Sequence, residues 1–352
     1  MNPIAIRLLN QQLFAPQYAN PTEVVAHMGA IQAQDYRMMR WAVALRTKHP
    51  TAKKFEKAYN KGEIIRLHLL RGTWQLIAAK DYGWMHALCA PMAEKAIRGW
   101  MKTNKVEISK VELQKVRKLF EKTCEKEGSA TKEELARAVR EGGMVMDNQR
   151  LSYHIRLGEL NGTLCSGKLT ERFATYALAA TRVKQGDIPT HEVMLRRLAE
   201  KYFKSHSPAT IEDFQWWSGL NGADCRRAME ELGEELDEIK NQQYSFYLHK
   251  KCRLNGYRRG STLLLPPFDE WLIGYKSREL VIKPENMGKA YTKNGIFFPV
   301  IAYNGHIVGK WKPWGKTEET VDFEGNKREW CTEKGWKEFQ SYWNPGKLSC
   351  SI

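Results

Sequence analysis

The chain has 352 residues, of which 42% are hydrophobic, and this length predicts two or three domains with packed cores. Its 56 lysines and arginines outnumber its 40 aspartates and glutamates, and the net charge of +16 is typical of nucleic-acid binding, although a generally basic protein shares it. No apolar run approaches the roughly 18 residues of a membrane-spanning helix. Arg7 interrupts the apolar N-terminal stretch, which therefore lacks a secretory layout. We expect a cytoplasmic protein that binds no membrane.

The seven cysteines are scattered and include no Cys-x-x-Cys pair, which is typical of a reduced protein and not of a disulfide framework. The nearest approach to a zinc motif is His191-Glu192, but Leu195 stands where the second histidine of His-Glu-x-x-His belongs. Phosphate loops and Gly-x-Ser-x-Gly nucleophile motifs are absent from the sequence. We expect neither a metal nor a cofactor.

The first 100 residues predict short helices followed by two strands with a basic turn. Helices are expected over residues 4–13, from Pro21 with Thr22 as N-cap, over 36–46 and over 53–60. Strands are expected over 63–70 and 73–79, with Arg71-Gly72 as the turn between them. A further helix follows over 81–97.

The same order, short helices followed by two strands, is predicted twice more. Helices over 109–126, 131–140 and 148–160 precede strands over 163–166 and 173–179, and Thr131 with Glu134 forms a capping box. Helices over 192–203, from Thr210 and over 223–232 come next, and the last of these carries Arg226 and Arg227 near its start, where recognition helices reach DNA.

Beyond residue 256 the chain turns β-rich. Strands are expected within 263–269, 295–301 and 307–311, with Asn304-Gly305 as a hairpin turn. The sequence therefore predicts an α+β, mainly helical fold of three tandem winged helix-turn-helix units with a β-rich C-terminal portion. The predicted domains are residues 1–100, 101–188, 189–256 and 257–352, the last packed with the winged helices.

Gln32 and Gln34 lie between two predicted helices, where the pattern otherwise calls for a packed interior. An unpaired buried amide costs about 1–3 kcal/mol, whereas two amides that face a cleft can hold one water or polar ligand. Residues two apart do not share a helix face, so the segment must be extended or bent for both to reach one cleft. The alternative is that each amide caps a neighbouring backbone group or faces solvent.

Basic and aromatic residues at the turns and at the recognition helix suit contacts with DNA. The candidates are Arg71, Trp74, Lys168, Arg172, Arg226, Arg227 and Lys310. The alternative is an ordinary solvated surface. Trp41, Trp216 and Trp217 are expected in the core, and the alternative is that they are base-stacking platforms.

Several ordered motifs resemble the AlkZ/YcaQ-like family of winged-helix DNA glycosylases, which remove bulky or crosslinking alkylated bases. The resemblance spans nearly the whole chain. It rests on residues 29–35 around Gln-Ala-Gln-Asp, 70–74, 207–219, 265–275, and 295–297 with 308–311.

The resemblance implies three winged helices around duplex DNA and the Gln-x-Gln branch of the family, with Gln32 and Gln34 as the catalytic residues. It implies monofunctional hydrolysis of the N-glycosidic bond of N7-alkylated purines by water, and the unhooking of interstrand crosslinks. Asp35, Gln75 and Asp269 are expected to support the site, although Gln75 stands where many relatives have histidine. We expect a monomer on double-stranded DNA. The alternative is a non-catalytic winged-helix protein with a regulatory or architectural role.

Overall fold

The computed structural model describes residues 2–184, 186, 188–240, 245–314, 319–325 and 330–344. The chain is α+β, with 50% helix and 16% strand, so the predicted mainly helical α+β class is confirmed. None of the helices in these ranges is both long and apolar enough to cross a bilayer. The six cysteines in these ranges are free, and Cys350 lies outside them.

The N-terminal part wraps four helices around a small antiparallel sheet with the strand order β1-β3-β2. The helices are α1 (Pro3–Asn10), α2 (Pro21–Met28), α3 (Met39–Ala44) and α4 (Ala52–Asn60), and the strands are β1 (Ile31–Gln32), β2 (Ile64–His68) and β3 (Trp74–Ala78). The short 3₁₀ turn η1 (Leu70–Gly72) joins β2 to β3, where the turn was predicted.

The predicted N-cap of α2 is wrong by two residues. Asn20 is the N-cap, because its side chain accepts a hydrogen bond from Thr22 N. Proline is favoured at the first helical position, so Pro21 places the cap one residue before itself. The Thr22 hydroxyl instead donates to Glu63 Oε2 over 3.1 Å.

The strand β1 was not predicted, and it decides the conformation of the glutamine segment. It pairs with β3, with Ile31 opposite Leu76 and Gln32 opposite Gln75. The helix α3 begins at Met39 and not at residue 36, because Asp35 Oδ1 accepts hydrogen bonds from Arg37 N and Met38 N, each over 2.9 Å. A capped turn thus separates β1 from α3.

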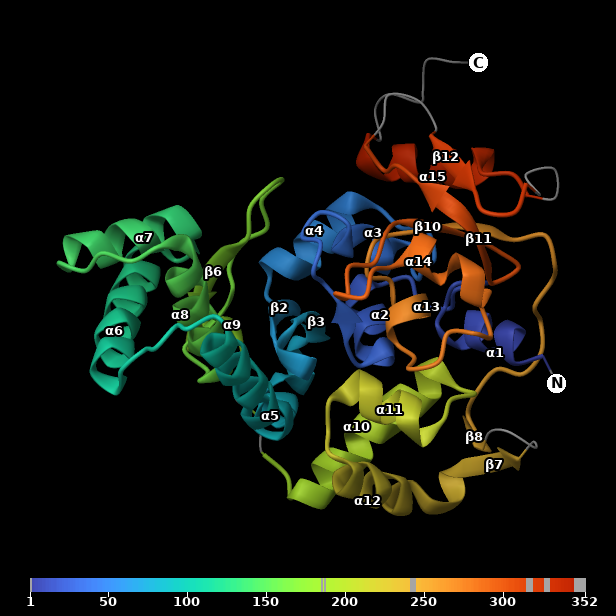
Figure 1. Cartoon of the computed structure of the whole chain (residues 1–352), viewed down its shortest axis with the longest axis horizontal. Coiled ribbons are helices and arrows are strands. Elements are labelled where there is room, and N and C mark those ends of the chain that lie inside the picture. Colours follow the sequence, from blue (N-terminus) through green and yellow to red (C-terminus); the bar gives the residue numbers. More distant parts are fainter. Residues whose placement is uncertain are drawn as a thin grey trace.

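The long helix α5 (Tyr82–Thr103) leads to a second lobe, seen at the left of Figure 1, and it runs through residue 100, where a domain boundary was predicted. The lobe has a sheet with the order β4-β6-β5. Its elements are α6 (Lys110–Glu127), β4 (Ala130–Thr131), α7 (Lys132–Glu141), α8 (Asn148–Leu160), β5 (Leu164–Ser166), β6 (Thr175–Leu178) and α9 (Ala179–Arg182). The predicted capping box of Thr131 and Glu134 is present.

A third set of helices packs on the N-terminal sheet, and the two share one apolar core that includes Leu67, Ile77, Leu198 and Trp217. Its elements are α10 (His191–His206), α11 (Ile211–Ser218), α12 (Gly222–Leu232), β7 (Leu236–Lys240) and β8 (Ser245–His249). Thr210 caps α11 as predicted, in a reciprocal capping box with Asp213.

The C-terminal portion is a four-stranded antiparallel sheet with the order β12-β11-β10-β9 and three short helices. Its strands are β9 (Thr262–Leu265), β10 (Val300–Tyr303), β11 (His306–Trp311) and β12 (Thr320–Asp322), and its helices are α13 (Glu270–Ile273), α14 (Met287–Ala290) and α15 (Glu333–Trp343). The hairpin turn at Asn304-Gly305 has positive φ at both residues, as that pair favours. Trp41 Nε1 donates to Leu264 O over 2.7 Å and ties this portion to the N-terminal part.

One element order recurs three times. A helix, a short β segment, two helices and two strands follow one another in α2-β1-α3-α4-β2-β3 and in α6-β4-α7-α8-β5-β6. The third series is α10-α11-α12-β7-β8, in which the bridge between Ala209 and Tyr247 takes the place of the short strand.

Candidate active site

The side chain of Gln32 is fixed by two neighbours on the adjoining strand. Gln75 Nε2 donates to Gln32 Oε1 over 2.6 Å. Thr73 Oγ1 lies 3.2 Å from the same oxygen and accepts from Gln75 Nε2 over 3.0 Å. Gln32 and Gln75 are buried, so these contacts are shielded from water. Gln32 Oε1 is therefore already hydrogen-bonded, whereas Gln32 Nε2 donates to no group in the described part of the chain.

Gln34 follows in a bend, half-buried, and its side chain forms no hydrogen bond with any described residue. The backbone is extended at Gln32 and bends at Gln34, so the two amides do not lie on a regular helix.

The residue between the two glutamines is held from both sides. Ala33 N donates to Trp74 O over 2.8 Å. Ala33 O accepts from Arg66 Nε over 3.0 Å. The backbone that carries both amides is thus fixed to β3 and β2.

A buried carboxylate lies behind this segment. Glu270, the first residue of α13, accepts a hydrogen bond from Gln32 N at Oε1 over 2.7 Å and one from Trp217 Nε1 at Oε2 over 3.1 Å. It is 1% exposed. Its ion-pair neighbour is His206, with Nε2 3.4 Å from Oε2, and no lysine or arginine nitrogen of the described residues lies within 4 Å. Burial lowers the pKa of His206, which favours the neutral ring.

Glu270 was missed as a site residue. The sequence signal was an acidic pair, Asp269-Glu270, directly after an apolar strand. Nothing local indicates that Glu270 reaches Gln32, which is 238 residues away in the chain.

Asp269 and Asp35, both expected to support the site, are occupied by structural partners. Asp269 forms a buried bidentate ion pair with Arg46, over 2.8 and 2.9 Å, and accepts from Trp271 N at the start of α13. It therefore fixes the helix that presents Glu270. Asp35 caps the turn that leads into α3.

The comparisons with known proteins identify the family of the chain. The family model described as "DNA glycosylase AlkZ-like" matches residues 25–338, which include both glutamines and Glu270. The chain belongs to the AlkZ-like DNA glycosylase family. It is therefore a DNA glycosylase, and the alternative of a non-catalytic DNA-binding protein is set aside.

A curated protein and a solved structure that the chain resembles both come from Streptomyces sahachiroi. The "Interstrand DNA cross-link repair glycosylase" is 25% identical in an alignment of 332 positions that covers 88% of this chain and 86% of that protein. The solved structure of "DNA glycosylase AlkZ" has a TM-score of 0.74 at 20% identity and covers 96% of this chain and 95% of its own, which shows a shared fold.

The predicted DNA contacts fall into separate places on the glycosylase. Arg71 is half-buried, and its Nη1 donates to Trp216 O over 3.1 Å. Trp74 is half-buried under the Arg66 guanidinium, 4.3 Å from the ring centre. Neither is a freely exposed turn residue.

Lys168 and Arg172 are exposed on the loop between β5 and β6, and this loop lies against the N-terminal part beside α4 (Figure 1). Leu169 N donates to Asn60 Oδ1 over 2.7 Å, and Thr170 N donates to the Tyr36 hydroxyl over 3.1 Å. The loop thus reaches the segment that follows Gln34.

The remaining three predicted contacts lie on other elements. Arg226 and Arg227 are exposed at the start of α12, and Arg227 is 3.4 Å from Glu192. Lys310 is half-buried on β11, with Nζ 5.1 Å from the centre of the Phe298 ring. No described contact joins these residues to Gln32.

The tryptophan predictions are confirmed for two residues and wrong for one. Trp41 and Trp217 are 2% and 1% exposed, in the core as expected, but Trp216 is 40% exposed. Successive helical residues differ by about 100° in direction, so one residue of an adjacent pair faces outward.

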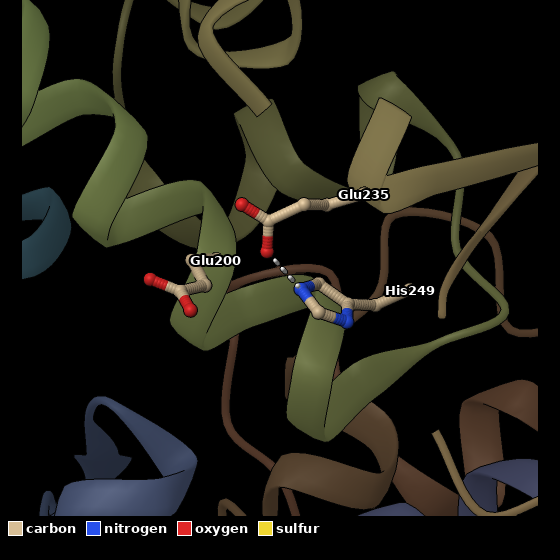
Figure 2. Close-up of side chains that lie close together, drawn as sticks. All are labelled: Glu200, Glu235 and His249. Atoms are coloured by element: carbon tan, nitrogen blue, oxygen red, sulfur yellow. Dashed lines mark ion pairs between the residues drawn. The ribbon is translucent and has the colours of Figure 1, made fainter. Parts of the chain in front are cut away.

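One other group of side chains has the composition of a metal site. Glu200, Glu235 and His249 place their potential ligand atoms within 4.8 Å of one another (Figure 2). Arg196 already pairs with Glu235, and Lys204 pairs with Glu200. His249 Nδ1 accepts from Lys251 N over 3.1 Å, which leaves the proton of a neutral ring on the Nε2 that faces Glu235. The group is an ion-paired network and not an open ligand set.

Proposed function

We propose that this glycosylase hydrolyses the N-glycosidic bond of N7-alkylated purines in double-stranded DNA, with water as nucleophile and no covalent enzyme intermediate. The observation that carries the proposal is the Gln32 amide, held by Gln75 and Thr73 on an extended strand. Gln32 and Gln34 are the proposed catalytic residues.

The chemistry requires little from the protein beyond position. Alkylation at N7 places a positive charge on the purine, so the bond from C1′ to N9 breaks with its electron pair leaving on the base. Water then forms the new bond at C1′ and loses a proton to solvent. Gln32 Nε2 donates a hydrogen bond to this water and Gln34 Oε1 accepts one from it, which leaves a lone pair for C1′.

The electrostatics of the site suit a cationic reactant. Both the alkylated purine and the oxocarbenium-like sugar carry positive charge, and the groups that hold Gln32 are neutral amide and hydroxyl groups. Glu270 adds a buried carboxylate that no lysine or arginine of the described residues neutralises at contact distance. A fixed negative charge near a developing cation stabilises the transition state.

The supporting residues have distinct proposed roles. Gln75 orients Gln32 directly. Asp269 holds α13 through Arg46, and Asp35 holds the turn after Gln34.

The recurring element order supports three winged-helix units within residues 1–100, 101–188 and 189–256, with 257–352 packed against them. We propose that the chain binds duplex DNA as a monomer, with Lys168, Arg172, Arg226, Arg227 and Lys310 at phosphates and Arg71 and Trp74 near the lesion. The relative named for interstrand cross-link repair supports crosslinks as further substrates, since cleavage of one linked purine separates the strands.

The test is the release of base from duplex DNA that contains N7-methylguanine or a nitrogen-mustard crosslink. Wild type is expected to release the base and to leave an abasic site, with no product trapped by borohydride. Gln32→Ala/Gln34→Ala is expected to lower the single-turnover rate by about 100-fold or more, because positioning is lost. The matched control is Gln149→Ala, an exposed glutamine on α8 in the second lobe, which should match wild type.

Two results would contradict different parts of the proposal. No release from any alkylated duplex would refute the substrate class. Release at the wild-type rate by the double variant would refute only the assignment of Gln32 and Gln34.

A further inference from the structure

An exposed aromatic side chain lies on α11, next in sequence to the Trp217 that contacts Glu270. Trp216 is 40% exposed, yet its indole is fixed, because Nε1 donates to Ile273 O over 3.0 Å. Ile273 ends α13, the helix that begins with Glu270. Because the indole is already fixed, it would lose little side-chain entropy when a ligand packs against its apolar surface.

Trp216 is joined to the site by short connections. Its neighbour Trp217 donates to Glu270, which in turn accepts from Gln32 N. On the other side, Arg71 Nη1 donates to Trp216 O, and Arg71 lies two residues before Thr73, a partner of Gln32.

The approach of Arg71 to Trp216 depends on two unusual backbone positions. Arg71 has a φ of +57°, in the left-handed region that a side chain with a Cβ rarely adopts. Gly219 ends α11 with a φ of +73°, and a Cβ there would lie 3.0 Å from Arg71 Cγ. The turn is therefore built to bring this guanidinium against α11, and strained positions cluster at functional sites.

Two guanidinium groups flank the indole. The Cζ atoms of Arg71 and Arg278 lie 5.4 and 5.3 Å from the ring centre. Burial lowers the pKa of both, to about 10 for Arg71, which stays protonated at neutral pH. Arg278 Nη2 is buried without a hydrogen-bond partner among the described residues, and neither arginine has a carboxylate oxygen of those residues within 4 Å. Glu270 acts on Arg71 and Asp213 acts on Arg278 only from beyond ion-pair distance, so the two guanidinium groups have no anion in direct contact among the described residues.

We propose that Trp216 is a stacking platform for a nucleobase that leaves the helical stack at the lesion, with Arg71 and Arg278 neutralising the phosphate of that nucleotide. This inference rests on the proposed function and extends it to substrate recognition. The base has two possible sources, the alkylated purine itself or the base opposite it.

A protein partner fits these features less well. Specific protein interfaces bury about 1,200–2,000 Å² in total. Here one flat ring stands between two cations, and base–aromatic stacking with flanking positive charge is the pattern of single-stranded nucleic-acid sites.

The test uses duplexes with a 2′-fluoro-stabilised N7-methylguanine, which binds without being cleaved. Trp216→Ala is expected to weaken binding to this duplex about tenfold, as expected for one lost base stack. Binding to the undamaged duplex should stay within about twofold, and Trp216→Phe should retain most of the affinity because a phenyl ring still stacks. Trp100→Ala, which removes an equally exposed tryptophan on α5, is the matched control.

A second arm identifies the base. An abasic analogue opposite the lesion abolishes the Trp216→Ala effect if the opposite base stacks, and leaves the effect in place if the alkylated purine stacks. Equal binding of the stabilised lesion by wild type and Trp216→Ala, with wild type active in base release, would overturn the platform alone. A wild type inactive on every alkylated duplex would overturn the proposed function instead. An equal loss on damaged and undamaged DNA would also overturn the platform, since it indicates general DNA contact.

Discussion

Two of the carboxylate–histidine groups among the described residues differ in what balances the negative charge. At the glutamine site, Glu270 accepts from Gln32 N and Trp217 Nε1 and faces the buried His206. In the second group, Glu235 and Glu200 face His249 and are paired with Arg196 and Lys204.

The second group is therefore a structural ion-pair network, whereas Glu270 has no lysine or arginine of the described residues in contact. Arg196 and Lys204 neutralise the second group within the protein, so it requires no ligand. Glu270 accepts from neutral N–H donors, and the attraction between its carboxylate and Arg71 acts from beyond ion-pair distance, so no cation of the described residues neutralises it in direct contact. Judged by residue types alone, the second group would be the stronger candidate for a functional site, because only it has the composition of a metal site.

The largest expected effect comes from removing the hydrogen bond that Gln75 donates to the Gln32 amide. Gln75→Ala removes the 2.6 Å hydrogen bond to Gln32 and should lower the single-turnover rate of base release about 10- to 100-fold, as for a lost buried polar contact. Gln75→His keeps a donor at the position and should retain most of the activity. Equal rates for alanine and histidine would show that Gln32 needs no partner there.

Removal of the two neutralising cations should turn the second group into a metal-binding site. Arg196→Met/Lys204→Met removes both cations, so two carboxylates and His249 face one another unpaired. We expect a loss of about 1–2 kcal/mol in the free energy of unfolding and a rise in melting temperature on addition of Zn²⁺. Wild type should show no such rise. A zinc response in wild type would contradict the assignment of an ion-paired network.

A smaller effect is expected at Thr73. Thr73→Val keeps the shape and removes the hydroxyl that contacts Gln32 and Gln75, so base release should slow about five- to tenfold, equivalent to about 1 kcal/mol. Thr73→Ser should restore the rate. Failure of serine to do so would indicate that the methyl group matters and not the hydrogen bond.

The smallest effect is a change in the pH dependence of stability. Burial lowers the pKa of His249 below its usual 6.5 in the folded chain. The unfolded chain therefore takes up this proton first, so His249 costs no stability above about pH 6.5 and progressively more below it. In urea unfolding between pH 7.5 and 5, His249→Gln should show a shallower slope, by at most about 1.4 kcal/mol per pH unit. The matched control is His49→Asn, which replaces an exposed histidine outside this ion-paired network.

Local signals predicted most of the helices and hairpins. The capping boxes at Thr131 and Thr210 and the turn at Asn304-Gly305 act within a few residues, so their chemistry is visible in sequence. The two-residue strand β1 was not predicted, since its pairing depends on β3, more than 40 residues later. The start of α2 at Pro21 was predicted, but its N-cap was misplaced, because Asn20 and Thr22 are both good caps and Pro21 decides between them.

The site was predicted in part for the same reason. Gln32 and Gln34 are identifiable as amides that must leave a helix to meet, and the family motif marks them. Glu270 and Trp216 depend on the packing of α13 and α11 against the N-terminal sheet, a contact between distant segments that no local pattern encodes.

The most direct test of the comparison is a matched pair of isosteric variants assayed for single-turnover release of N7-methylguanine from duplex DNA. Glu270→Gln cannot accept from both Gln32 N and Trp217 Nε1 and removes the buried negative charge, so the rate should fall about tenfold or more. Glu235→Gln breaks its pair with Arg196 far from the glutamines in the chain, and its rate should stay within about twofold of wild type at a temperature where both variants are folded. Equal rates for the two variants would contradict the account.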